Sequence, residues 1–152
     1  METKLRMHLV VGGYLIYNAK VLLIHHKKLK AWLPVGGHID ENETPDKAVK
    51  REFKEEVNLD VRILNNSMIK NSGKVKKRLA IPIDVHVHNV GNHDHCCFFY
   101  LCESGNISKL RINKNEVDDY EWFSPSDLKQ RRIHADVRNI ALEAFRIFNS
   151  KK

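Results

Sequence analysis

Three glutamates, Glu52, Glu55 and Glu56, lie close together in a segment whose composition favours a helix. On a helical wheel they share one arc of about 100°, which borders the apolar stripe formed by Phe53 and Val57. Carboxylates so near one another repel unless a cation neutralises them. Oxygen ligands of this kind suit hard cations such as Mg²⁺ or Mn²⁺. The pattern therefore predicts a divalent-metal site, and a solvated acidic helix face is the alternative.

The residues before this segment favour the metal interpretation. Gly36 and Gly37 have no β-carbon, so their backbone carbonyls can approach a metal ion closely. From Gly37 to Leu59 the chain resembles the Nudix box, G-x5-E-x7-R-E-U-x-E-E-x-G-U, in which U is a bulky apolar residue. The fixed positions match except at Asn58, where the family has glycine. Asparagine also tolerates the left-handed conformation that ends a helix, so we expect the helix cap to survive.

The resemblance implies a hydrolase that cleaves the pyrophosphate linkage of a nucleoside diphosphate derivative, with Mg²⁺ or Mn²⁺ as its cofactor. A nucleoside triphosphate or a related nucleotide is the expected substrate. By their positions in the box, Glu52, Glu55 and Glu56 are expected to be catalytic and to bind the metal. The backbone carbonyl of Gly36 or Gly37 is a further expected ligand. A catalytically inactive Nudix-fold module that binds a ligand or a nucleic acid is the alternative function.

Three other residues receive roles from the same resemblance. Glu43 and Arg51 are expected to form a structural pair that braces the loop against the helix. Glu116 precedes Glu121 at a spacing similar to that of a glutamate that completes the metal site or acts as the base in some family members. Glu116 is therefore predicted to be catalytic and to bind the metal, and an ordinary loop carboxylate is the alternative. Two neighbouring acids are rival candidates, Asp118 and Asp119.

Several residues near the expected phosphate path are candidates for substrate binding. Lys27 and Lys30 precede the glycines, close to where phosphates are expected to lie, although a solvated surface lysine is the alternative for each. Trp32 is expected either to stack on a base or to fill the hydrophobic rim. Asp136 is suited to hydrogen-bond a purine edge, but a role as the N-cap of the last helix is the one that we favour.

Four histidines gather in one part of the sequence: His86, His88, His93 and His95. His86 and His88 alternate along a predicted strand and so share one face of it. The nearby Cys96 and Cys97 make a zinc site one interpretation, but the spacing matches no structural zinc pattern. We favour a role for these histidines, His95 among them, in lining the substrate pocket or flanking the metal site.

The rest of the chain supplies the elements that must position these residues. Apolar runs at 9–17 and 20–26 are joined by Asn18-Ala19 and predict a hairpin. Thr44 is the expected cap of a helix that runs from Pro45 to about Val57. Further strands are predicted at 61–69, 79–88, 96–102 and 121–123, and further helices at 125–130 and 136–150. This order predicts an α/β fold with a mixed sheet, and the Nudix resemblance implies an α/β/α sandwich.

Length and composition bound the protein as a whole. Its 152 residues fit one Nudix hydrolase domain spanning 1–152. A net charge of +7 favours an anionic partner, which the acidic box predicts to arrive through metal ions. The few cysteines fit a reducing compartment, and no apolar run approaches the roughly 18 residues of a membrane span. The expected protein is cytoplasmic and has a small nucleotide as its partner rather than a membrane.

A nucleic-acid partner is not expected from the basic loop at 74–78. That loop lacks the interleaved aromatic residues on which bases stack, so a solvated hairpin loop is the better interpretation. Capped RNA as a substrate and a homodimeric assembly are both left open by the sequence.

Overall fold

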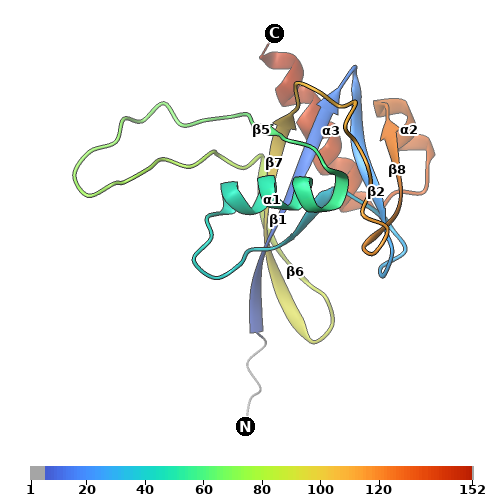
Figure 1. The fold of residues 1–152 in the computed structure, drawn as a ribbon, viewed down its shortest axis with the longest axis horizontal. Helices are drawn as coiled ribbons and strands as arrows, with labels where there is room; N and C mark the ends of the chain where they lie inside the picture. The colour runs from blue at the N-terminus through green and yellow to red at the C-terminus, as the bar shows by residue number, and fades with distance from the viewer. Residues whose placement is uncertain (1–5, 152) are drawn as a thin grey trace.

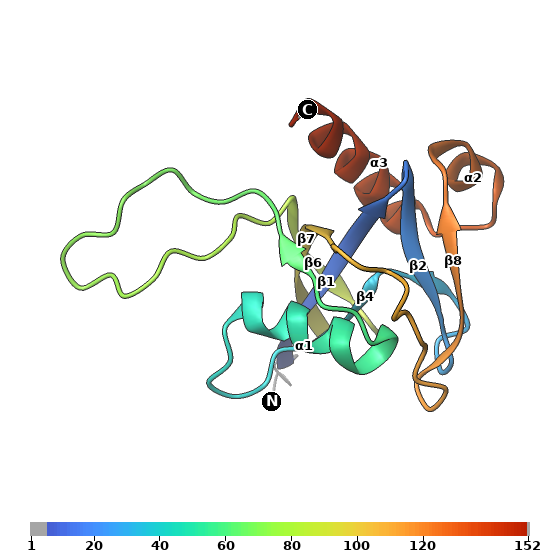
Figure 2. The ribbon, with the colours of Figure 1, turned by 45° about the horizontal axis from the view of Figure 1, so that its top comes forward.

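The computed structural model describes residues 6–151, so residues 1–5 and 152 of the expected domain lie outside it. Strands dominate the first part of the chain and helices the end (Figures 1 and 2). The strands are β1 (Arg6–Tyr17), β2 (Lys20–His26), β3 (Trp32–Leu33), β4 (Val35–His38), β5 (Arg62–Ile63), β6 (Asp84–Asn89), β7 (His93–Glu103) and β8 (Val117–Phe123). The helices are α1 (Pro45–Val57), α2 (Pro125–Gln130) and α3 (Ala135–Ser150).

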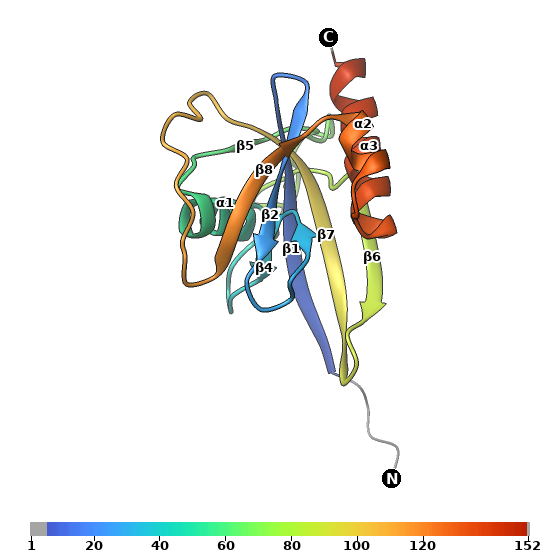
Figure 3. The ribbon, with the colours of Figure 1, turned by 90° about the vertical axis from the view of Figure 1, so that its right-hand side faces the viewer.

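The predicted mixed sheet is confirmed, and β1 is its centre. β1 pairs parallel with β7 and antiparallel with β4 and, at its far end, with β2. β2 in turn pairs antiparallel with β3 and β8, while β5 and β6 both pair antiparallel with β7. Helix α1 covers one face of the sheet, and α2 and α3 cover the other (Figure 3). The fold is therefore the expected α/β/α sandwich.

Each face of the sheet has its own hydrophobic core, because side chains alternate along β1. Val11 and Leu15 point toward α1, where they share a core with the fully buried Phe53. Tyr14 and Ile16 point the other way, into the core beneath α2 and α3. The α1 core fixes the helix that carries the glutamates, since burying one large apolar side chain contributes roughly 1.5–3 kcal/mol.

The local signals at the hairpin and at α1 are confirmed. Asn18 and Ala19 both have positive φ, 51° and 60°, as a tight two-residue hairpin turn requires. Thr44 accepts a hydrogen bond from the Lys47 amide, and α1 ends at Asn58, which has a φ of 59°. The side chain of Asn58 also donates to the Lys109 carbonyl at 3.0 Å. Asparagine therefore performs the left-handed cap and adds a tether that glycine could not provide.

The predicted strands at 61–69 and 79–88 are wrong in extent. Of the first, only Arg62–Ile63 pairs with β7, and Asn65, with a φ of 74°, turns the chain away from the sheet. The second forms a strand only from Asp84, as β6. Residues 64–83 form a long loop that projects from the body and carries the basic residues at 74–78 (Figure 1). An isolated bridge between Asn66 and Ala80 joins the two arms of this loop, and at its ends the amides of Leu64 and Ile83 donate to carbonyls of β7. Its β-propensity is not realised because it finds no continuous partner strand.

Two properties bear on the expected cellular setting. The three cysteines, Cys96, Cys97 and Cys102, are free thiols. Within residues 6–151, none of the helices has the length and apolar character needed to cross a membrane.

Candidate active site

Helix α1 places two of its glutamates against the sheet. Glu52 and Glu56 are one turn apart, and both are buried, at 8% and 5% exposure. The two carboxyl groups interact with each other, and the backbone amide of Gly36 points to Glu56. Within the described residues, Oε2 of Glu56 is buried and has no hydrogen-bond partner. A buried carboxylate oxygen without a partner is costly unless a ligand completes its environment.

The electrostatics of this pair show what ligand it suits. Burial is the main cause that raises the pKa of both Glu52 and Glu56 above the ordinary range, and the neighbouring carboxylates add to the rise at Glu56. Two such groups in contact retain a proton between them unless a cation neutralises their charge. An oxygen-only donor set with an unpartnered oxygen fits Mg²⁺ or Mn²⁺.

Glu55 lies at the edge of this arrangement. Its side chain is half exposed and accepts a hydrogen bond from Nη1 of Arg51 at 3.2 Å. It does not line the cleft that contains Glu52 and Glu56. The three glutamates therefore share the predicted arc of the helix, but only two of them are buried.

The expected brace between Glu43 and Arg51 is confirmed. Nε of Arg51 donates to Oε2 of Glu43 at 2.8 Å, and Nη2 donates to Oε1 at 3.0 Å. This two-pronged contact holds the pKa of Glu43 below its usual range. The same guanidinium donates to the His38 carbonyl at 2.9 Å and to Glu52 Oε1 at 2.9 Å. Arg51 thus ties the loop, the end of β4 and a buried carboxylate into one unit.

Two glycines let β4 pack closely against both its partner strand β1 and helix α1. Gly36 and Gly37 pair with Gly12 and Val11 in the antiparallel ladder. A β-carbon on Gly36 would collide with the backbone of β1, and one on Gly37 would collide with the carboxylate of Glu52. The backbone at these positions is therefore close to the acidic pair.

A cavity of about 500 Å³ opens above this pair. Glu116, from the turn before β8, lines it together with Glu52 and Glu56, and its charge acts on Glu56. Asp40 lines it as well, so segments distant in sequence bring four carboxyl groups to one cleft. Basic side chains line the same cavity, namely Lys27 and Lys28. A cleft with both signs of charge suits a polyphosphate bound together with cations.

Three of the other candidate residues near this cleft do not line it. Asp118 accepts a hydrogen bond from the Lys30 ammonium at 2.9 Å and lies 3.6 Å from His25. Neither Lys30 nor Asp118 lines the cleft, and Asp119 does not line it either. Lys27 does line it, although its Nζ donates to the Lys114 carbonyl at 3.1 Å.

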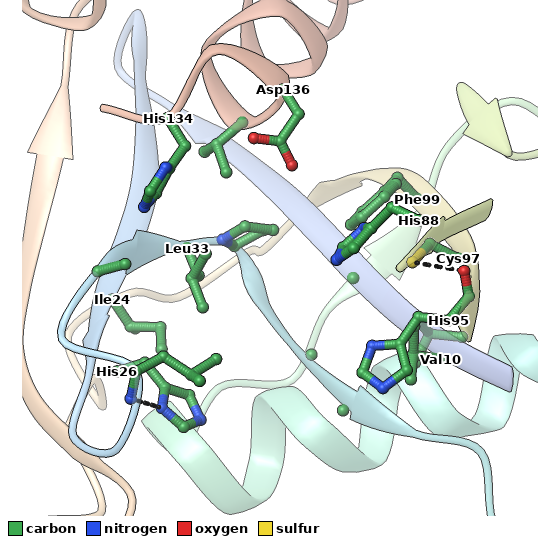
Figure 4. Close-up of a pocket in the computed structure, with 18 of the residues that line it drawn as sticks. Val10, Ile24, His26, Leu33, His88, His95, Cys97, Phe99, His134 and Asp136 are labelled. Carbon is green, nitrogen blue, oxygen red and sulfur yellow. Dashed lines mark hydrogen bonds between the residues drawn. The ribbon is translucent and has the colours of Figure 1, made fainter. Parts of the chain in front are cut away.

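A second cavity, of about 550 Å³, adjoins the first and shares His26, Gly36, Gly37, His38 and Glu56 with it. Its walls are mostly apolar, with polar groups around them, and Figure 4 shows these side chains arranged about the hollow. The apolar members include Val10, Ile24, Leu33 and Phe99, and the polar members include His26, His88, His95, His134 and Asp136. An apolar slot with a few polar groups is suited to a nucleobase.

The structure corrects the preferred role of Asp136. Helix α3 begins at Ala135 with His134 as its N-cap, and no side chain caps it. Asp136 therefore lies inside the first turn, and its carboxylate lines the second cavity (Figure 4). The N-cap is two residues earlier than expected, so Asp136 lies within the helix and its side chain faces the cavity.

Of the two roles expected for Trp32, the structure favours the rim. Its ring packs edge-on against Phe123 and His25, with centroids 5.3 Å and 5.1 Å apart, and it does not line the second cavity. Conversely, His26 and Phe99 line that cavity without having been expected there. No local motif marks them, because they come from separate strands that converge only in the fold.

Comparisons with known proteins show which family model and which proteins the chain is similar to. The family model described as the NUDIX domain matches residues 6–144. An RNA pyrophosphohydrolase from Hydrogenovibrio crunogenus is 32% identical over 122 residues, which cover 74% of this chain and 69% of that protein. A NUDIX-family hydrolase from Clostridium perfringens has a solved structure that is 31% identical, with a TM-score of 0.79 and coverage of 95% and 99% of the two chains. An Ap4A hydrolase from C. elegans shares the fold at 16% identity, with a TM-score of 0.73 and the same coverage.

Proposed function

Because the chain belongs to the Nudix hydrolase family, we propose that it cleaves the pyrophosphate linkage of a nucleoside triphosphate or a related nucleotide with Mg²⁺. The observation that carries this proposal is the buried pair of Glu52 and Glu56 on the floor of a cleft that Lys27 and Lys28 also line. The adjoining apolar cavity offers room for the base. A nucleotide is the class of molecule that presents a base and a polyphosphate side by side.

The metal would be held by groups of this chain that already lie together. Glu52, Glu56 and Glu116 line the cleft, and the backbone of Gly37 lies against Glu52. Glu55, at the rim, is the outermost acid of the proposed set. When bound, Mg²⁺ neutralises phosphate charge and lowers the pKa of a coordinated water.

The side chains of the cleft then have distinct tasks. Lys27 and Lys28 attract the polyphosphate. A carboxylate, Glu52 or Glu116, accepts the proton of the attacking water as its oxygen bonds to phosphorus and the bond to the bridging oxygen breaks. The bridging oxygen leaves with the departing phosphate. Arg51 does not touch the substrate in this scheme, and it positions Glu52 through Nη1.

The nucleoside is proposed to occupy the second cavity. Phe99 and Leu33 provide apolar contact, while Asp136 and His134 provide hydrogen-bonding groups at the start of α3. His95 lines the opposite wall (Figure 4). This arrangement would orient the base and leave its phosphates over the glutamates, since the two cavities meet at Gly36 and Glu56.

The RNA pyrophosphohydrolase relative favours a second candidate substrate, the 5′-phosphorylated end of an RNA chain. The same cleft would receive its polyphosphate and the same cavity its terminal base. The catalytically inactive alternative is disfavoured because the chain retains Glu52, Glu55 and Glu56.

The test is a Mg²⁺-dependent hydrolysis screen of the full chain. Nucleoside triphosphates, dinucleoside polyphosphates, sugar nucleotides, ADP-ribose and RNA with a 5′-triphosphate or a cap are compared by phosphate and nucleotide release. Glu56→Gln is expected to abolish turnover, whereas Glu121→Gln, on an exposed ion pair with Arg131, is the control. Turnover that survives Glu56→Gln contradicts the site, and nucleotide binding without any turnover supports the inactive module.

A further inference from the structure

Four imidazole rings converge beside the second cavity, and one of them, His38, also lines the carboxylate cleft. They belong to His8, His38, His93 and His95, here called the four-histidine cluster. Nδ1 of His8 lies 3.2 Å from Nε2 of His38, and Nε2 of His93 lies 2.9 Å from Nε2 of His95. One ring nitrogen from each residue can be chosen so that all four lie within 4.8 Å of one another. The four nitrogens thus surround a common point.

The register of the sheet explains this convergence. His8 on β1 is directly opposite His95 on β7, and His93 is two residues away on the same face. His38 on β4 is opposite Val10, which is two residues from His8 and again on that face. Three neighbouring strands therefore each direct imidazoles to one patch. Their spacing in the sequence could not reveal this, because His8 and His38 are far from His93 and His95.

The distances suit a tetrahedral metal ion. With metal–nitrogen bonds of about 2.0–2.1 Å, the nitrogens of a tetrahedral zinc site lie about 3.3 Å apart. The pairs His8–His38 and His93–His95 are already close to that spacing. Small rotations of half-exposed rings would bring the remaining nitrogens into range. His38 is exposed and the other three rings are partly buried, so an ion can reach the patch from solvent.

The donor set selects the kind of ion. Imidazole nitrogen favours Zn²⁺, Cu²⁺ and Ni²⁺, whereas Mg²⁺ and Ca²⁺ require oxygen. Asp94, the acid between His93 and His95, accepts a hydrogen bond from the side chain of Asn89 at 2.9 Å and is not a member of the cluster. We propose that the four-histidine cluster binds one divalent transition-metal ion, with Zn²⁺ as the reference ion, at a site that uses none of the glutamates of the carboxylate cleft.

An ion here would act on the architecture of the active site. It would link β1, β4 and β7 through their side chains, and His38 directly follows Gly37. His38 and His95 also line the second cavity, and Figure 4 shows His95 at its wall. The metal would therefore hold the Gly36–Gly37 strand against the sheet and place positive charge beside the proposed nucleotide pocket.

Two other arrangements compete with this site. The four rings could form hydrogen-bonded imidazole pairs without any metal, which the same short distances also allow. A neighbouring group, His86, His88 and Cys97, could take the ion instead. In that group His86 Nδ1 contacts Asp84 Oδ2 at 2.6 Å, as a carboxylate orients a histidine ligand. The experiment must distinguish the four-histidine metal site from the metal-free imidazole pairs and from a metal site at the neighbouring group.

The test uses the full chain without an affinity tag, titrated with Zn²⁺ and with Co²⁺ in a large excess of Mg²⁺. One equivalent is expected to bind, and Co²⁺ is expected to show the intense visible bands of a tetrahedral site. His8→Asn and His93→Asn each remove one proposed metal ligand at a position that does not line either cavity. Losing a group that only hydrogen-bonds to a metal ligand lowers metal affinity roughly 10–100-fold, so each variant should weaken Zn²⁺ binding by more than that.

Matched variants identify the site. His86→Asn changes a histidine of the neighbouring group and should leave Zn²⁺ affinity within a few-fold of the unmodified chain. Glu56→Gln should also retain the tight site, which makes this result independent of the hydrolase proposal. Absence of Zn²⁺ binding in the unmodified chain overturns the proposal, as does full binding by both His8→Asn and His93→Asn. If Zn²⁺ binding is lost in His86→Asn alone, the ion belongs to the neighbouring group, and this result also overturns the proposal.

Discussion

The backbone of Gly37 lies so close to the side chain of Glu52 that a β-carbon at position 37 would be 2.5 Å from Glu52 Oε1. The loop glycine and the helix glutamate therefore occupy complementary space. Gly37→Ala is expected to push the carboxylate out of place and to lower kcat about 100-fold, because a displacement of about 1 Å at a reacting group has an effect of that size. Steady-state hydrolysis measures it.

Gly105→Ala is the control for this glycine. A β-carbon at position 105 would meet no atom within 4 Å, so this variant should keep the activity and stability of the unmodified chain. Circular dichroism and the thermal midpoint show whether Gly37→Ala still folds. If folded Gly37→Ala retains full turnover, Glu52 does not need the position that the structure gives it.

The brace between Arg51 and Glu43 is expected to stabilise the fold as well as the site. Arg51→Lys keeps the charge but loses the two-pronged contact with Glu43 and the bonds to Glu52 and His38. The free energy of unfolding should fall by about 2 kcal/mol, since hydrogen bonds to charged groups contribute roughly that much. Chemical denaturation measures this change.

The exposed pair of Arg131 and Glu121 offers the comparison. Arg131→Lys disrupts a similar two-pronged contact on the surface, where the free energy of unfolding should scarcely change. Equal losses of stability in Arg131→Lys and Arg51→Lys would contradict the view that partial burial gives the Arg51 brace its strength.

Local chemistry explains why much of this protein could be predicted from its sequence. The bounds of α1 follow from a Thr-Pro start and an asparagine that accepts the left-handed conformation at position 58. The Asn18-Ala19 turn and the alternation along β1 similarly depend on neighbours in the chain. The spacing along α1 places Glu52 and Glu56 together because one helical turn separates them.

Features that depend on distant contacts could not be predicted in this way. The runs at 64–69 and 79–83 were predicted to be strands, but they lack a continuous partner strand and belong to a loop. Lys30 was expected near the phosphates, yet its ammonium pairs with Asp118 on β8. The four-histidine cluster is the clearest case, because β1, β4 and β7 become neighbours only through the sheet.

Glu56 is expected to make the stability of the metal-free protein depend on pH. Its pKa in the folded protein is raised, mainly by burial, above the ordinary value of 4.5. Above pH 5 the folded protein therefore keeps a proton that the unfolded chain releases, so the free energy of unfolding falls as pH rises. The slope approaches about 1.4 kcal/mol per pH unit until the folded group also ionises.

Removing this carboxyl group or supplying its cation should abolish that slope. Glu56→Gln in chelator is expected to be more stable than the unmodified chain at pH 8 and nearly equal to it at pH 5. Adding Mg²⁺ should raise the thermal midpoint of the unmodified chain at pH 8 and leave Glu56→Gln nearly unchanged. If the free energy of unfolding of the metal-free chain does not change with pH, burial does not raise the pKa of Glu56 in the folded protein.

Asp136 is expected to contribute to recognition of the base rather than to the reaction. Its carboxylate lines the apolar cavity from the first turn of α3, whereas Glu52 and Glu56 come from α1. Asp136→Ala should raise KM for the best nucleotide about 10-fold or more, with a smaller change in kcat, because a lost hydrogen bond to substrate removes binding in the ground and transition states alike. Glu143→Gln, on an exposed ion pair of the same helix, is the control. An equal fall in kcat for nucleotides of every base would contradict a role in selectivity.

Glu116 is the carboxylate that the fold adds to the α1 pair. It lines the cleft with Glu52 and Glu56, whereas Asp118, two residues away, pairs with Lys30 outside it. Glu116→Gln should lower kcat by about 10²–10⁴-fold if it accepts the proton of the attacking water, since a positioned base contributes that range. Asp118→Asn should leave kcat nearly unchanged, and the pH profile of Glu116→Gln should lose its acidic limb. A metal-holding role predicts instead that high Mg²⁺ rescues Glu116→Gln, and unchanged kcat would leave Glu52 as the base.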